Sequence, residues 1–399
     1  MKHHQVQHSL PMWILIGILV GCVGKPTTPV IILSPTAEIL SIEPTKIPTT
    51  PFIEPTNIPP TSFIEPTLQS SATLAPKPPT RTPYPSDTPL PTIVFPELTG
   101  DYLGQEPPGM EASLFAPGII STGMNERDIT FTPDGKELYY SMQGEGFFVI
   151  LFLKQENGIW TSPQVAPFSG QYNDIEASIA PDGKRLFFTS DRPRFEGDTS
   201  TDFDIWFVER MGDDWGAPQN LGDVINSDAD EYYASLTKDG TLYFTASYPG
   251  GRGKEDLYRS RLLDGQYQTP ENLDKPVNSP EGEYNAFIAP DESYLIFGRS
   301  GQTWISFRQQ DGTWTRPSSM DMEMSINAVC WSPYVSYDGK YLFISSTARP
   351  GMDLAPYPPS YDEIQKSILD PENAILLGKK HFFYEDIYWM SSQVIEIFR

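Results

Sequence analysis

The 399-residue chain has few cysteines and histidines. Its two cysteines, Cys22 and Cys330, are too few for a disulfide framework. The four histidines are His3, His4, His8 and His381. The shortage between His8 and His381 argues against histidine metal sites and against Ser-His-Asp or Cys-His catalysis in that region.

Basic residues are also scarce. The chain has 28 Lys and Arg against 52 Asp and Glu, a formal net charge of −24. Residues 1–95 hold five of each sign, so 23 basic and 47 acidic residues follow them. A region this acidic repels nucleic acid and anionic lipid, and it suits cations, cationic peptides or neutral sugars. The alternative is that the charge only keeps a surface protein soluble.

No long hydrophobic run is present. The apolar stretch Leu10–Val20 follows Lys2, is short for a membrane span, and ends in small residues as a secretory signal does. Leu19-Val20-Gly21-Cys22 resembles the lipobox of bacterial lipoproteins. The resemblance implies a signal peptide over 1–21, a lipidated Cys22, and an extracytoplasmic protein anchored at the bacterial cell surface through its acyl chains alone. An ordinary cleaved signal with a chance cysteine is the alternative.

Proline, in contrast, is abundant and concentrated. The 40 prolines crowd the segment between Gly24 and Pro96, where Ile42–Thr45 recurs as Ile53–Thr56 and Ile64–Thr67. Proline at this density blocks helices and sheet ladders and favours extended or disordered chain. Residues 22–96 are therefore predicted to be a lipidated, disordered Pro/Thr-rich linker. This linker is either a spacer that holds the following domain beyond the cell wall, or a disordered segment without that role.

A short motif then recurs through the rest of the chain, first as Phe131–Tyr140. The five copies are centred on Asp134, Asp182, Asp239, Asp291 and Asp338. Each has a short strand, a tight Asp-Gly type hairpin, an alternating aromatic strand, a third strand and a short outer strand. In three copies the third strand opens with Asp, at Asp204, Asp256 and Asp386. A spacing of about 50 residues suits one four-stranded propeller blade per copy.

These units resemble the WD40-like PD40 repeats of TolB-type β-propellers over roughly residues 111–399. Ser190–Pro193 and Asp386–Trp389 also fit that pattern. The resemblance implies that residues 97–399 form a single all-β propeller, and that it is an interaction or substrate-gating domain. It does not identify a ligand, because propellers have many activities.

The blade count follows from the ends of the repeat region. Ala116–Ser121 resembles Gly222–Ser227, the stretch that lies between an outer strand and the third unit. By this likeness Ser113–Ala116 is predicted to be an outer strand that is not preceded by three inner strands of its own blade. It would complete the last blade, close a five-bladed ring and remove exposed sheet edges. A six-bladed ring is the alternative, if the last forty-odd residues form more than one blade.

The strand order of a propeller brings the inner-strand starts and the loops between the second and third strands to one face. The residues expected there are Glu126, Asp174, Glu176, Glu231, Tyr232, Glu283, Tyr284, Trp331, Arg192 and Arg349. Carboxylates gathered at one mouth repel each other unless a cation neutralises them. They are either a pocket for a cation, a cationic peptide group or a sugar stacked on Tyr or Trp, or structural groups that cap strands and pair with arginines. In the fifth copy Cys330 stands where the other copies have an acidic residue at the start of the inner strand, and it is expected to be a buried small residue.

Two insertions are expected on the same face. The stretch from Asp191 to Asp204 contains Asp198 and Asp202 and is oxygen-rich enough to consider Ca²⁺, but it matches no EF-hand loop, and we predict no cofactor. The stretch 349–386 is either a lid or a surface loop.

Two functions remain open from the sequence. The favoured one is a monomeric binding module that captures a peptide, glycan or protein partner at the propeller axis and binds no nucleic acid. The alternative is a glycoside hydrolase that uses a pair of the inner-strand carboxylates.

Overall fold

The computed structural model describes residues 95–144, 147–324, 326, 329–347 and 385–399. The chain divides into two units, Met1–Pro85 and Ser86–Arg399, and all described residues belong to the second. None of the helices in this described part is long and apolar enough to cross a membrane. Cys22, the linker repeats, Arg349 and residues 348–384 of the second insertion lie outside the described residues.

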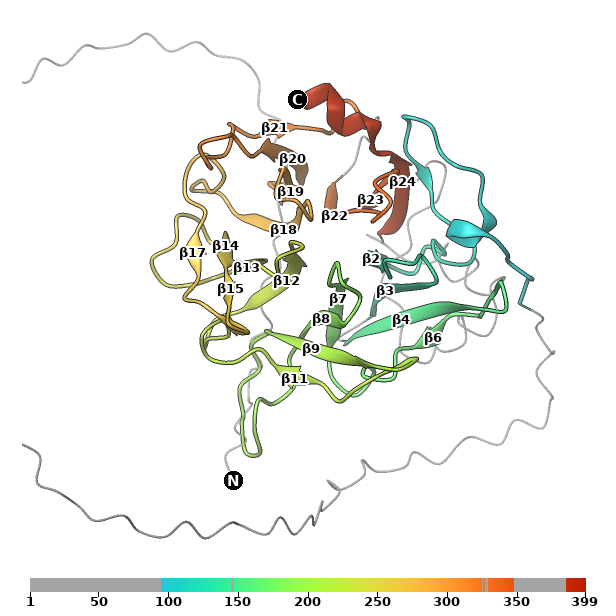
Figure 1. Ribbon diagram of the computed structural model, residues 1–399, viewed down its shortest axis with the longest axis horizontal. Helices are drawn as coiled ribbons and strands as arrows, with labels where there is room; N and C mark the ends of the chain where they lie inside the picture. Colours follow the sequence, from blue (N-terminus) through green and yellow to red (C-terminus); the bar gives the residue numbers. More distant parts are fainter. Residues whose placement is uncertain (1–94, 145–146, 325, 327–328, 348–384) are drawn as a thin grey trace, which may run out of the picture. The chain divides into compact units, whose positions relative to one another are not determined.

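Five antiparallel blades surround one axis (Figure 1). In four of them the chain runs outward strand by strand, and in the fifth the outermost strand is β1 from the start of the domain. Blade 1 contains β2 (Glu126–Phe131), β3 (Glu137–Gly144) and β4 (Phe147–Glu156), with the short outer strands β5 (Ile159–Trp160) and β6 (Gln164–Val165). Blade 2 contains β7 (Asp174–Ile179), β8 (Arg185–Ser190) and β9 (Asp204–Met211), with β10 (Asp214–Trp215) and β11 (Gln219–Asn220).

The remaining blades repeat this order. Blade 3 contains β12 (Glu231–Leu236), β13 (Leu242–Ala246), β14 (Asp256–Ser260) and β17 (Glu271–Asn272), with a hairpin of β15 (Leu262–Leu263) and β16 (Gln266–Tyr267). Blade 4 contains β18 (Glu283–Ile288), β19 (Tyr294–Arg299), β20 (Gln302–Phe307) and β21 (Ser318–Ser319). Blade 5 contains β22 (Cys330–Val335), β23 (Tyr341–Ser346), β24 (Asp386–Ser391) and β1 (Ser113–Leu114).

The inner strands close a ring. Each of β2, β7, β12, β18 and β22 contacts the next, and β22 contacts β2. The predicted all-β propeller with five four-stranded blades is therefore confirmed. We call the face at which the five inner strands begin the mouth face; the Asp-Gly type turns lie at the other ends of these strands.

The N-terminal part of the domain closes the seam of the ring, as predicted. Strand β1 pairs with β24 through Ser113–Trp389 and Leu114–Tyr388, two residues shorter than expected. The preceding turns cross from blade 1 to blade 5. The backbone N–H of Trp160 donates to the carbonyl oxygen of Leu98 at 2.8 Å, and the Tyr102 hydroxyl donates to Asp338 Oδ1 at 2.9 Å.

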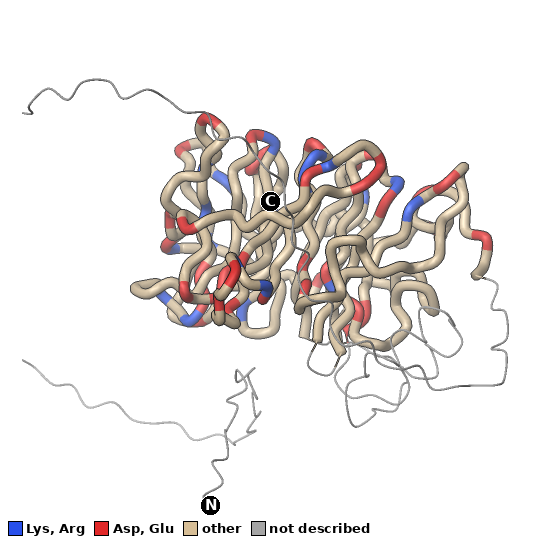
Figure 2. Tube along the Cα trace, turned by 90° about the horizontal axis from the view of Figure 1, so that it is seen from below, with Lys and Arg blue, Asp and Glu red and all other residues tan. Residues whose placement is uncertain are grey.

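Packing between blades forms most of the core. The middle strands are buried on both faces because each blade lies between two others. Their central residues are fully buried: Tyr140, Phe188, Phe244, Phe297 and Ile344. Charged residues instead gather at the turns and loops at the two ends of the blades (Figure 2). The 3₁₀ helices η1 (Asp101–Gly104) and η2 (Ser392–Phe398) flank the ring in sequence.

Candidate functional site

Three glutamates at the inner-strand starts are buried and form hydrogen bonds within a local turn. Glu231 accepts from the backbone N–H and the hydroxyl of Ser227 at 2.8 and 2.6 Å. Glu283 accepts from the same groups of Ser279 at 2.9 and 2.5 Å. Glu126 accepts from the hydroxyl of Thr122, so each glutamate pairs with a Ser or Thr four residues earlier. This spacing is visible in the sequence and was the missed signal for a structural role.

Arginines at the end of the second strand of a blade, or just after it, neutralise two of the carboxylates on the mouth face. Arg192 pairs with Asp174, which also accepts from the Ser190 hydroxyl at 2.7 Å. Arg299 Nε lies 2.6 Å from Glu283 Oε1. Burial raises the pKa of Asp174 and Glu283, while these arginines oppose the rise. The geometry of these groups matches the structural alternative that the sequence left open.

A second ring of residues lies two positions further along each inner strand. All five have a left-handed backbone with φ between 51° and 62°, and the strand register shifts there: Asp128, Glu176, Tyr233, Asn285 and Ser332. In four blades the backbone N–H of this residue donates to a hydroxyl on the middle strand of the preceding blade, as Glu176 does to Ser141 Oγ at 2.9 Å. The bulge therefore joins neighbouring blades and turns these side chains toward the axis.

Arg127 is surrounded by three carboxylates near the axis. Its Nε lies 2.8 Å from Asp128 Oδ2 and 3.9 Å from Glu385 Oε2, and its Nη2 lies 3.3 Å from Glu176 Oε1. Burial, with a further contribution from the Asp128 charge, raises the pKa of Glu176 to about 8. Burial also raises the pKa of Glu385 to about 7. One guanidinium cannot neutralise three carboxylates, so the cluster retains protons near neutral pH.

The predicted aromatic residues are engaged with the protein itself. Trp331 donates from Nε1 to Glu385 Oε2, and the Tyr284 hydroxyl accepts from the backbone N–H of Gly301 at 2.8 Å. Tyr232 is buried. These three aromatic side chains are therefore occupied by contacts or burial within the protein.

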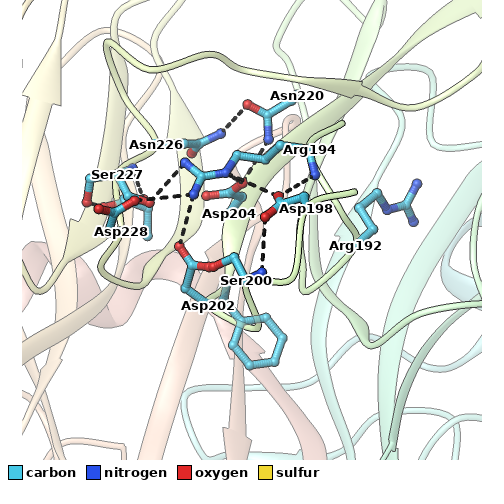
Figure 3. A network of polar contacts seen from close by, with 12 residues as sticks. Arg192, Arg194, Asp198, Ser200, Asp202, Asp204, Asn220, Asn226, Ser227 and Asp228 are labelled. Carbon is cyan, nitrogen blue, oxygen red and sulfur yellow. Dashed lines mark hydrogen bonds and ion pairs between the residues drawn. The ribbon is translucent and has the colours of Figure 1, made fainter. Parts of the chain in front are cut away.

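The acidic insertion of blade 2 is organised by an arginine (Figure 3). Arg194 lies 3.5 to 3.7 Å from the carboxylates of Asp198, Asp202 and Asp204. It lies among the carboxylates that the sequence suggested for Ca²⁺. Within the described ranges, no group of three or more His, Cys, Asp or Glu side chains is placed to hold a metal ion.

An open pocket on the mouth face lies between blades 1 and 2. It has a volume of about 360 Å³ and is lined by Phe147, Phe148, Val149, Gly170, Gln171, Tyr172, Asn173, Asp191 and Pro193. None of the predicted site residues is in this lining, although Arg192 lies over the Tyr172 ring. The lining comes from the start of β4, the loop before β7 and the loop after β8. The adjacent phenylalanines at the start of β4 are the only local signal of the pocket, and the sequence analysis missed them.

A scan of family models and a search of curated proteins each find no match. Solved structures of modest likeness include two TolB proteins. A putative TolB from Agrobacterium tumefaciens is 18% identical with a TM-score of 0.38, covering 57% of this chain and 72% of that one. TolB from Acinetobacter baumannii is 18% identical with a TM-score of 0.37, covering 57% of this chain and 49% of that one.

A structure of a nidogen/laminin complex is also similar. It is 15% identical with a TM-score of 0.36, covering 56% of this chain and 73% of the other. At these identities the likeness concerns the fold alone.

Proposed function

We propose that the protein is a lipid-anchored binding module of the bacterial cell surface, in which the propeller captures a partner through its mouth face. The observation that carries the proposal is the open pocket of about 360 Å³ between blades 1 and 2. Its volume lies in the range of small-ligand sites, about 300–1,000 Å³. Cys22 supplies the anchor, and the Pro/Thr-rich linker supplies the distance from the membrane.

The glycosidase alternative loses its support in this geometry. Retaining and inverting glycosidases place two carboxyl groups on either side of the scissile bond. The five candidate carboxylates bind Ser, Thr, Arg or backbone donors, and none of them lines the pocket. Asp191 is the one carboxylate among the described residues that line the pocket, and it accepts two hydrogen bonds from Asn173. We therefore propose binding without catalysis.

The test is binding of the purified full chain to peptide and glycan arrays, with Phe148→Ala/Tyr172→Ala beside the wild type. Phe195→Ala is the matched control, because Phe195 is an aromatic residue that is 66% exposed and lies outside the pocket lining. We expect the double variant to lose the array signal and the control to keep it. Equal binding by the double variant would show that the pocket is not the binding site, and a wild type that binds neither array would contradict the proposed function.

The anchor has its own test. Metabolic labelling with a radioactive fatty acid should label the wild type, and Cys22→Ser should abolish the label. A labelled Cys22→Ser protein would exclude this residue as the anchor.

A further inference from the structure

We infer that the pocket between blades 1 and 2 binds a neutral saccharide. The inference rests on the proposed function and names the ligand class for the same pocket. It follows from the charges of the lining side chains, from one positioned aromatic ring, and from a pair of polar side chains whose hydrogen-bonding capacity is only partly used.

The lining disfavours both an anionic and a cationic ligand. Among the described residues that line it, Asp191 is the one carboxylate and none is Lys, Arg or His. An anion would lie in a strongly acidic domain, and the nearby Arg192 guanidinium is already paired with Asp174. A cation would meet Asp191, whose two oxygens already accept from Asn173, and it would approach the Arg192 guanidinium, which lies over the Tyr172 ring.

The Tyr172 ring is positioned to stack against a ligand. Its side chain is at the surface, 36% exposed, and Arg192 Cζ lies 5.4 Å from its ring centroid. Arg192 is itself fixed by Asp174 and by the carbonyl oxygen of Phe168. The guanidinium lies over the ring, and the Tyr172 side chain remains partly exposed at the pocket. Polarised C–H groups of a sugar ring suit the negative face of an aromatic ring.

Asn173 and Asp191 form a fixed polar pair. The backbone N–H and the side-chain amide of Asn173 donate to the two Asp191 oxygens at 2.9 and 2.6 Å. Asn173 Oδ1 accepts from the backbone N–H of Phe148 at 3.0 Å. Each Asp191 oxygen keeps a second lone pair, and the Asn173 amide keeps one proton. A hydroxyl both donates and accepts, so adjacent hydroxyls of a sugar match this pair.

A peptide strand fits the pocket less well. Peptides that add to a sheet need an unpaired strand edge. Strand β4 is paired with β3 from Phe147 to Lys154, and its other edge pairs with β6 at Leu151 and Phe152. At the pocket itself the N–H of Phe148 is taken by Asn173. A ligand is therefore recognised mainly by side chains. The volume of about 360 Å³ has room for at least one sugar ring.

The test titrates the full chain with neutral oligosaccharides (maltotriose, cellotriose, chitotriose, mannotriose and xylotriose), with an acidic trisaccharide and with proline-rich and mixed peptides. We expect a neutral oligosaccharide to bind. Tyr172→Ala should weaken it by about tenfold, the loss of one aromatic contact, whereas Tyr172→Phe should keep affinity within about threefold. Asp191→Ala should weaken it comparably, and Phe195→Ala should leave it unchanged. Thermal melting of each variant separates loss of the site from loss of the fold.

The outcomes separate the two proposals. Binding of peptides alone, sensitive to Tyr172→Ala, would overturn the saccharide inference and leave the proposed binding module standing. Oligosaccharide binding that is unchanged in both Tyr172→Ala and Asp191→Ala would overturn the assignment to this pocket. A chain that binds no neutral sugar, acidic sugar or peptide overturns both.

Discussion

The phenolic hydroxyl of Tyr233 in β12 donates a hydrogen bond to the carbonyl oxygen of Pro333 in β22, 3.0 Å away. The two strands belong to the third and fifth blades, so this bond crosses the axis. The backbone N–H of Tyr233 also donates to Glu176 Oε2 in the second blade, at 3.0 Å. One residue thus connects three blades through polar contacts, because Tyr233 itself belongs to the third blade.

Tyr233→Phe should lower the free energy of unfolding. The ring remains, but the buried carbonyl of Pro333 loses its donor, a cost of about 1–3 kcal/mol. Urea titration followed by tryptophan fluorescence measures the change. Tyr172→Phe is the control, because its hydroxyl is at the surface, and it should shift stability by less than about 0.5 kcal/mol. Equal effects of the two variants would refute a structural role for the cross-axis bond.

Arg127→Met should destabilise the propeller strongly at pH 8. Among the described residues, Arg127 supplies the one guanidinium within 4 Å of Asp128, Glu176 and Glu385. Its removal leaves three buried carboxylates, and breaking such a buried pair typically costs about 3–5 kcal/mol. At pH 5.5 protonation of the glutamates should reduce the loss. The surface pair of Arg252 and Asp274 is the comparison, and Arg252→Met should cost less than about 1 kcal/mol. A pH-independent loss in Arg127→Met would argue against charge as its cause.

The wild type should be more stable at pH 5.5 than at pH 8.5. Burial raises the pKa of Glu231 and of Glu176 to about 8 and that of Glu385 to about 7, whereas unfolded glutamates titrate near about 4.3. Between those limits the folded state binds more protons than the unfolded state, so the free energy of unfolding falls as pH rises through the folded pKa values. Melting temperatures at constant ionic strength test this. Glu231→Gln should flatten the slope, and a melting temperature that rises toward pH 8.5 would contradict the prediction.

Phe115→Ala should weaken the seam of the ring. The Phe115 side chain is fully buried, and its ring centroid lies 5.2 Å from that of Phe343 and 5.1 Å from that of Trp389. Truncating a core phenylalanine costs about 3–5 kcal/mol. Phe195→Ala makes the same substitution at an exposed position and should change the melting temperature little. An equally small shift for Phe115→Ala would mean that the segment around β1, which closes the ring, does not stabilise it.

The sequence was sufficient for the blades because their signals are local. The Asp-Gly type turns fix the hairpins, and even Glu292, which replaces glycine in the fourth copy, adopts a left-handed φ of 59°. The third strands of blades 2, 3 and 5 begin at Asp204, Asp256 and Asp386, as predicted. The seam was predictable for the same reason, because Ala116–Ser121 carries the pattern that precedes other inner strands.

The site depends on contacts that no local pattern specifies. Arg127 has Ile175, Tyr232, Tyr284 and Trp331 as its counterparts in the other blades, so nothing in the repeat marks it as the partner of Glu176 and Glu385. The pocket needs the β4 start, the loop before β7 and the loop after β8 to meet. Only the Ser or Thr four residues before each buried glutamate could have been read in advance.

The contacts of residues 98–102 determine which part of the propeller first resists a pulling force applied on the N-terminal side. The carbonyl oxygens of Leu98 and Gly100 are held by the backbone and indole N–H groups of Trp160, before the chain reaches β1. A pull applied at Phe95 is therefore resisted first by blade 1 and then by the Tyr102 contact with Asp338 in blade 5. The force therefore does not act directly on the two-residue strand β1. The ring should withstand a pulling force that would separate such a short strand from its sheet if it were applied to that strand alone.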